Sequence, residues 1–174
     1  MLDDTIEHGG ATFKVALEFD VDMGPPWESE DGHGPVSDWK HHAFGQGTKF
    51  LKVLGERVLV WDSGSYRTYD FAEACKIARR DGWGAVGDAG MKPRQKAAHA
   101  AEADFQRLRA WCEGQWSYVG VTVELLDDKG DPTGETAALW GIESDAGEYL
   151  VEVAHELAEQ VLASIEARGK AAVK

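Results

Sequence analysis

Short polar turns separate most of the apolar runs in this chain, and this feature restricts the fold more than any other. The clearest turn is DDKGDPTG at 127–134, between the apolar runs 116–126 and 135–142. Strands joined by short turns pair antiparallel, because a parallel pair needs a crossover of a dozen or more residues. Two β-branched runs, 48–54 and 57–62, predict a further hairpin, which a short strand at 66–69 extends.

A strand and a long loop precede this hairpin. Residues 12–20 alternate apolar and polar side chains, which is the pattern of a half-buried strand. Its apolar positions are Phe13, Val15, Leu17 and Phe19. Residues 21–47 contain three of the five prolines, so we expect a loop there. Loops of this length inside compact domains are often functional.

Three further segments show the spacing of amphipathic helices, each with boundary residues of the expected kind. A side-chain cap and a closing glycine bound the first helix, a proline opens the second, and a polar cap opens the third. These residues are Asp70, Glu73 and Gly82 for the first helix, Pro93 and Glu113 for the second, and Ser144 or Asp145 for the third. Residues 168–174 are expected to fray.

The predicted order of elements indicates an α+β fold. A mainly antiparallel sheet covered by about three helices forms a two-layer sandwich, and 174 residues suit a single domain over 1–174. No apolar run approaches the roughly 20 residues that span a bilayer, and the acidic N-terminus lacks the apolar region of a signal peptide. Cys75 and Cys112 are then two reduced thiols in a cytoplasmic protein without a membrane partner.

The formal net charge of −13 opposes direct binding to nucleic acid, unless basic residues gather in one patch. Residues 71–112 are such a basic island, with five acids and eight bases. The expected basic patch consists of Arg79, Arg80, Arg94, Lys96, Arg107 and Arg109. The expected acidic, partner-binding face combines the last helix with the 127–134 turn, and its residues are Glu148, Glu152, Glu156, Glu159, Asp127, Asp128 and Asp131.

The loop segment 28–42 concentrates carboxylates and histidines, which are ligand types for divalent metals. The candidate ligands are Asp31, His33 and Asp38, but their spacing matches no known metal motif. The chain also lacks the GxSxG and phosphate-loop motifs. We therefore expect no catalytic residue, no metal and no cofactor, and a loop that Trp27 and Trp39 anchor to the body.

Four strings resemble a group of short, acidic, uncharacterised proteins encoded by tailed phages and prophages of proteobacteria. They are PPWESEDGHGPVSDWK, YDFAEACKIARRDGWG, WSYVGVTVELLD and LWGIESDAGEYLVEVAHELAEQVL, and the similarity covers roughly residues 25–165. The resemblance implies an accessory protein expressed in a host cytoplasm, and it carries no site residues.

Three functions follow as expectations. The first is stoichiometric binding to a host protein, as an anti-CRISPR or anti-restriction inhibitor whose acidic face mimics DNA. The second is a small metal-binding protein or hydrolase that uses the 28–42 loop. The third is a nucleic-acid-handling accessory that uses the basic island at 76–109. The charge and the absence of motifs favour a binding protein over an enzyme.

Overall fold

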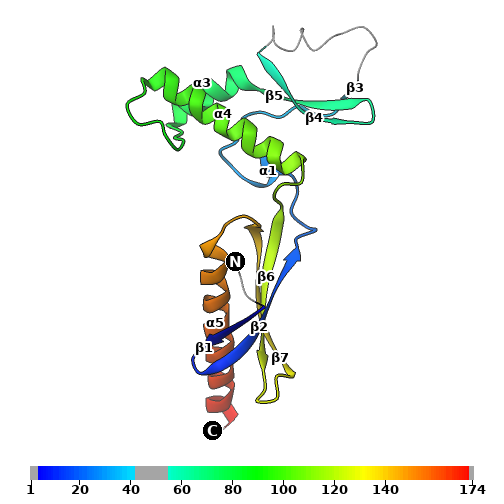
Figure 1. Ribbon diagram of the computed structural model, residues 1–174, viewed down its shortest axis with the longest axis vertical. Coiled ribbons are helices and arrows are strands. Elements are labelled where there is room, and N and C mark those ends of the chain that lie inside the picture. Colours follow the sequence, from blue (N-terminus) through cyan, green and yellow to red (C-terminus); the bar gives the residue numbers. More distant parts are fainter. Residues whose placement is uncertain (1–3, 42–54, 173–174) are drawn as a thin grey trace. The chain divides into compact units, whose positions relative to one another are not determined.

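The computed structural model describes residues 4–41 and 55–172, and its antiparallel strands and helices confirm an α+β fold (Figure 1). The chain divides into two compact units, which we describe separately. Unit 1 consists of Met1–Met23 and Trp116–Lys174, and unit 2 of Gly24–Gln115. The described strands belong to two sheets, one in each unit. The expectation of one domain over 1–174 stays a prediction.

Unit 1 contains a four-stranded antiparallel sheet in the order β1-β2-β6-β7. Its strands are β1 (Thr5–His8), β2 (Ala11–Phe19), β6 (Tyr118–Leu126) and β7 (Pro132–Glu143). The last three were predicted, whereas β1 was not, because four mostly polar residues give no clear pattern. Gly9 and Gly10 both have positive φ and form the two-residue turn of the β1–β2 hairpin.

Helix α5 (Glu148–Ala172) lies against one face of this sheet (Figure 1). The core between them is apolar and includes Phe13, Val121, Val123, Val153 and Leu157. The helix extends to Ala172, and the Arg168 guanidinium donates a hydrogen bond to Glu135 of β7. The fraying expected over 168–174 stays a prediction.

A β-bulge interrupts the pairing of β6 with β7 between Val119 and Val121. The buried carboxylate of Asp20 fixes the backbone around it. Its Oδ2 accepts a hydrogen bond from the Gly141 N–H, with 3.0 Å between the atoms. Its Oδ1 accepts from the N–H groups of the next turn, at Asp22 and Met23. One carboxylate therefore ties the end of β2 to the bulge in β7.

Among its described residues, 24–41 and 55–115, unit 2 contains a three-stranded antiparallel sheet in the order β3-β5-β4 and three helices. Its elements are α1 (Pro26–Ser29), β3 (Lys40–His41), β4 (Glu56–Asp62), β5 (Ser65–Asp70), α3 (Phe71–Asp81) and α4 (Pro93–Cys112). The core includes Leu59, Tyr69, Ala101, Phe105 and Leu108. The strands predicted at 57–62 and 66–69 are confirmed, while that predicted at 48–54 lies outside the described residues.

Asp70 and Gly82 cap α3 as predicted, whereas the Asp70 N–H donates to the Pro35 carbonyl oxygen and the Glu73 side chain pairs with Lys76. The Asp70 Oδ1 accepts a hydrogen bond from the N–H of Glu73 at 2.9 Å. Gly82 has a φ of 71° and ends the helix in the left-handed conformation, which only glycine adopts at little cost. Both boundaries follow from local chemistry.

Candidate functional site

The net charge of the protein lies in unit 1. The segments 1–23 and 116–174 contain 18 acidic and 5 basic residues, a net charge of −13. Residues 24–115 contain 13 acidic and 13 basic residues, a net charge of zero. The acidic character of the chain is therefore a property of one folded unit, and any electrostatic function is expected to reside there.

Four carboxylates lie along the outer face of α5, and we call Glu148, Glu152, Glu156 and Glu159 the acidic stripe. All four residues are exposed. The opposite face of the helix is buried against the sheet through Leu150, Val153, Ala154, Leu157 and Val161. Among the described residues, no basic side chain forms an ion pair with the stripe. At 1.5 Å per residue, the stripe is about 17 Å long.

The structure places the other acidic group of the prediction elsewhere in unit 1. Asp127, Asp128 and Asp131 are exposed in the β6–β7 turn. This turn is near Glu135, which accepts a hydrogen bond from Arg168 in the last turns of α5. Along the helix, Arg168 is about 14 Å from Glu159 and about 30 Å from Glu148, the two ends of the stripe. The Asp127 Oδ1 accepts hydrogen bonds from the N–H groups of Lys129 and Asp131. That carboxylate therefore stabilises the turn.

Unit 2 pairs much of its positive charge with its own carboxylates. Three of the six residues of the expected basic patch form ion pairs within unit 2, and these pairs are Arg80–Asp81, Lys96–Asp88 and Arg109–Glu113. Arg79 and Arg94 are exposed, and Arg107 is half-buried. Local pairing reduces the positive potential that a nucleic acid would meet.

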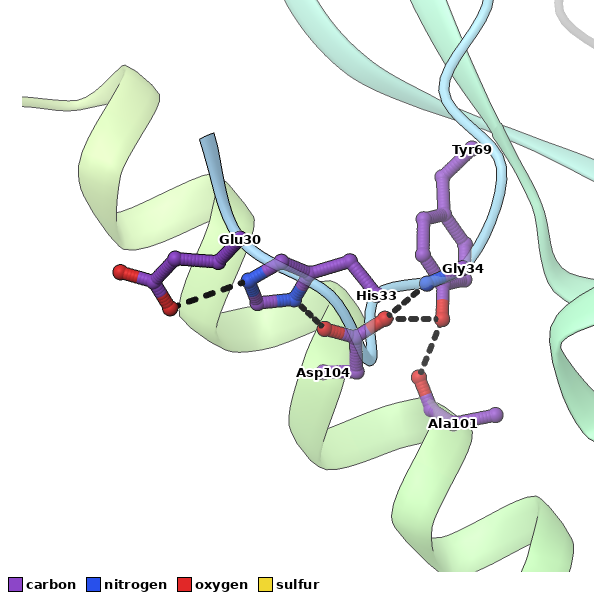
Figure 2. A network of polar contacts seen from close by, with 6 residues as sticks. All are labelled: Glu30, His33, Gly34, Tyr69, Ala101 and Asp104. Atoms are coloured by element: carbon purple, nitrogen blue, oxygen red, sulfur yellow. Dashed lines mark hydrogen bonds and ion pairs between the residues drawn. The ribbon is translucent and has the colours of Figure 1, made fainter. Parts of the chain in front are cut away.

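A polar network joins the long loop of unit 2 to α4 (Figure 2). The Asp104 Oδ1 lies 2.6 Å from His33 Nδ1, and the Asp104 Oδ2 accepts hydrogen bonds from the Gly34 N–H and the Tyr69 hydroxyl. The Tyr69 hydroxyl also lies 3.3 Å from the Ala101 carbonyl oxygen. Since a carboxylate only accepts hydrogen bonds, His33 carries its proton on Nδ1 in this pair.

This network has the geometry of an anchor. A histidine oriented by a carboxylate resembles a general base, but His33 Nε2 is a buried atom, 3.8 Å from Glu30 Oε2. A catalytic base has to reach the proton of a substrate. Burial raises the pKa of the Tyr69 phenol, and the bond to Asp104 raises it further, so that hydroxyl stays a donor at neutral pH. The arrangement holds the 30–36 segment against α4.

The candidate metal ligands do not converge. His33 contacts Asp104 and Glu30, whereas Asp31 and Asp38 are exposed. Within residues 4–41 and 55–172, no group of three or more His, Cys, Asp or Glu side chains is placed to hold a metal ion. Asp104 was not predicted, because it is 71 positions away from His33 and only the tertiary fold brings the two together.

Comparisons with known proteins identify no relative. No protein-family model, no curated protein and no solved structure matches this chain. Among the described residues, no helix is long and apolar enough to cross a membrane. The functional argument therefore depends on the surface of the molecule itself.

Proposed function

We propose that this protein acts by binding stoichiometrically to a basic surface of another protein, through unit 1. The observation that carries this proposal is the separation of charge, since unit 1 has a net charge of −13 and unit 2 has none. A field of one sign concentrates and orients a partner of the opposite sign. The acidic stripe on α5 is the contact surface, because its carboxylates are exposed and aligned.

The stripe resembles one strand of nucleic acid at reduced charge density. Successive carboxylates four residues apart are about 6 Å apart along the helix axis. Phosphates of one DNA strand are about 3.4 Å apart along the duplex axis. The stripe thus supplies about one charge for every two phosphates of one strand. A groove that binds DNA through lysine and arginine would accept such a surface, at lower affinity for each unit of length.

The biological setting that we propose is that of a phage accessory protein in a bacterial host. Its target would be a host defence protein that binds DNA, such as a CRISPR complex or a restriction enzyme. This setting is supported by the resemblance of the four sequence strings, and by an acidic unit of the kind that competes with DNA for a basic groove. The inhibitor would act at a molar ratio near one, because it would occupy the groove without chemistry.

The proposal is tested by affinity capture from a proteobacterial lysate with three forms of the protein, followed by mass spectrometry. The first form is unmodified. The second neutralises the acidic stripe through Glu148→Gln, Glu152→Gln, Glu156→Gln and Glu159→Gln. The third is a matched control that neutralises four exposed acids of unit 2 through Glu28→Gln, Asp31→Asn, Asp38→Asn and Asp62→Asn.

We expect the stripe variant to lose basic partners that the unmodified protein and the control both retain. Capture should also fall steeply as the salt concentration rises from about 0.1 M to about 0.5 M, because salt screens exposed charges. A captured nuclease is then assayed with increasing amounts of the protein, and inhibition should be complete near equimolar addition. Equal capture by all three forms would disprove the role of the stripe.

A further inference from the structure

Strand β2 is longer than the strand that covers its outer edge. β1 pairs with Ala11 to Lys14, and the Asp4 carbonyl oxygen accepts a hydrogen bond from the Val15 N–H at 2.8 Å. On the other edge, β6 pairs with β2 as far as Phe19. Within the part of the chain that the structure describes, no strand pairs with the outer edge of β2 at residues 16–19. We call this segment the open edge.

The main-chain groups of β2 alternate between its two edges. The Val15 N–H points to the β1 side, where it bonds Asp4, and the Asp20 N–H points to the β6 side, where it bonds the Tyr118 carbonyl oxygen. Leu17 and Phe19 have the same parity as Val15, so their N–H and C=O groups point to the open edge. An uncovered row of such groups is a template for another strand.

Two side chains of the open edge, and one just beyond it, are apolar and exposed. Leu17 is 44% exposed, Phe19 is 65% exposed and Val21, just beyond the strand, is 80% exposed. Single exposed hydrophobic residues are common, but three at alternate positions, beside main-chain groups that none of the described strands covers, are the features that strand-addition sites use. Hydrogen bonds to the main chain give such sites affinity, and the alternate side chains give specificity.

The charge around the open edge selects the occupant. A groove that runs from the end of β2 toward β7 is lined by Phe19, Val21 and Trp140, and also by the acids Glu18 and Asp22. A second copy would bring another net charge of −13 to this edge, and like charges repel. An extended segment that alternates lysine or arginine with apolar residues suits both the open edge and the negative charge beside it.

We propose that the open edge of β2 binds an extended cationic segment of the partner protein as an added β-strand. This inference rests on the proposed function, since it adds a second contact of the same acidic unit to the same partner. The probe is a labelled, acetylated seven-residue peptide that alternates lysine and valine. Two comparison peptides are used. One carries glutamate in place of lysine. The other carries N-methyl groups on one lysine and the adjacent valine, which removes one main-chain N–H donor from each edge of the peptide strand.

Binding is measured by fluorescence anisotropy with the unmodified protein, Leu17→Pro and Leu17→Thr. Proline removes the outward N–H and is tolerated on edge strands, whereas threonine keeps this donor and suits a strand. We expect the lysine peptide to bind, and Leu17→Pro and the N-methylated peptide each to weaken binding about tenfold or more. Leu17→Thr should stay within about threefold of the unmodified protein, and the glutamate peptide should not bind.

Several outcomes would overturn the inference. Two of them need no protein variant. The inference is wrong if the lysine peptide does not bind at millimolar concentration, or if the N-methylated peptide binds equally well. A dimer in analytical ultracentrifugation that Leu17→Pro abolishes would assign the edge to a second copy. If the stripe variant loses its captured partners while Leu17→Pro keeps both peptide and partners, only the open edge fails and the proposed function stands.

Discussion

The indole of Trp140 in β7 occupies the place where Gly120 in β6 would carry a side chain. A Cβ atom added to Gly120 would overlap with the ring atoms Cδ2, Cε3 and Cζ3 of Trp140. The β-bulge, held by the carboxylate of Asp20 on the Gly141 N–H, fixes the strand that carries this ring. A tryptophan that is 47% exposed thus depends on a buried glycine for its position, next to the groove at the end of β2.

Gly120→Ala should therefore destabilise the protein by about 1–3 kcal/mol, which is the usual cost of an atom forced into a packed site. The measurement is urea denaturation of the single variant and of the same substitution in a Trp140→Ala background. Removing the ring removes the overlap, so the cost should fall clearly in that background. An equal cost in both backgrounds would show that the ring is not the cause.

Asp104→Asn should destabilise unit 2 by about 1–3 kcal/mol, because the amide cannot accept from His33, Gly34 and Tyr69 together and leaves a buried donor unpaired. Tyr69→Phe removes one of these bonds and should cost about 1 kcal/mol. Urea denaturation checks both values. If Asp104→Asn cost no more than Tyr69→Phe, the His33 and Gly34 bonds would have no part in stability.

Stability should fall in acid through Glu56. The hydrogen bond from Lys40 Nζ, at 2.9 Å, holds the pKa of the Glu56 carboxyl below its usual value of 4.5, and Thr68 contributes in the same direction. Because the folded pKa is lowered, this contribution is present above about pH 4.5 and is lost as the pH falls through the folded pKa.

Glu56→Gln tests this effect in melting curves between neutral pH and pH 3. The variant should be less stable at neutral pH by up to about 1 kcal/mol, and the two curves should converge in acid. The exposed residue Asp38, substituted by Asn, is the control. A difference that stays constant over the whole pH range would contradict the prediction.

The two thiols should react slowly in the folded protein. Burial raises the pKa of Cys112 to about 11 and raises that of Cys75 as well. At pH 8 only about one Cys112 in a thousand is then a thiolate, so alkylation by iodoacetamide should be about a hundredfold slower than after unfolding. Peptide mapping of both sites, with and without urea, measures this ratio. Equal rates in the two conditions would exclude protection by burial.

Local signals account for the elements that the sequence predicts well. The hydrogen bond from the Glu73 N–H to Asp70 and the positive φ of Gly82 depend on neighbouring residues, so α3 begins and ends as expected. The division of the strands between two sheets depends on which distant segments pair. Phe19 pairs with Val119, a hundred positions later, and no pattern within one segment contains that information.

The two surfaces that we propose for binding show the same distinction. The spacing of Glu148, Glu152, Glu156 and Glu159 predicts one exposed helix face, and the structure has that face. The alternation in β2 predicts a buried apolar row, yet only Phe13 and Val15 are buried. Leu17 and Phe19 lie beyond the reach of β1, whose length the sequence does not reveal.

Unit 2 is inserted between two adjacent strands of unit 1, since the chain leaves after β2 and returns at β6, its direct neighbour in the sheet. During synthesis, the neutral unit is complete once residue 115 has left the ribosome. The acidic unit has to wait for α5, which covers its sheet. A translation product interrupted before α5 would lack the acidic stripe, so the binding that we propose would require synthesis through α5.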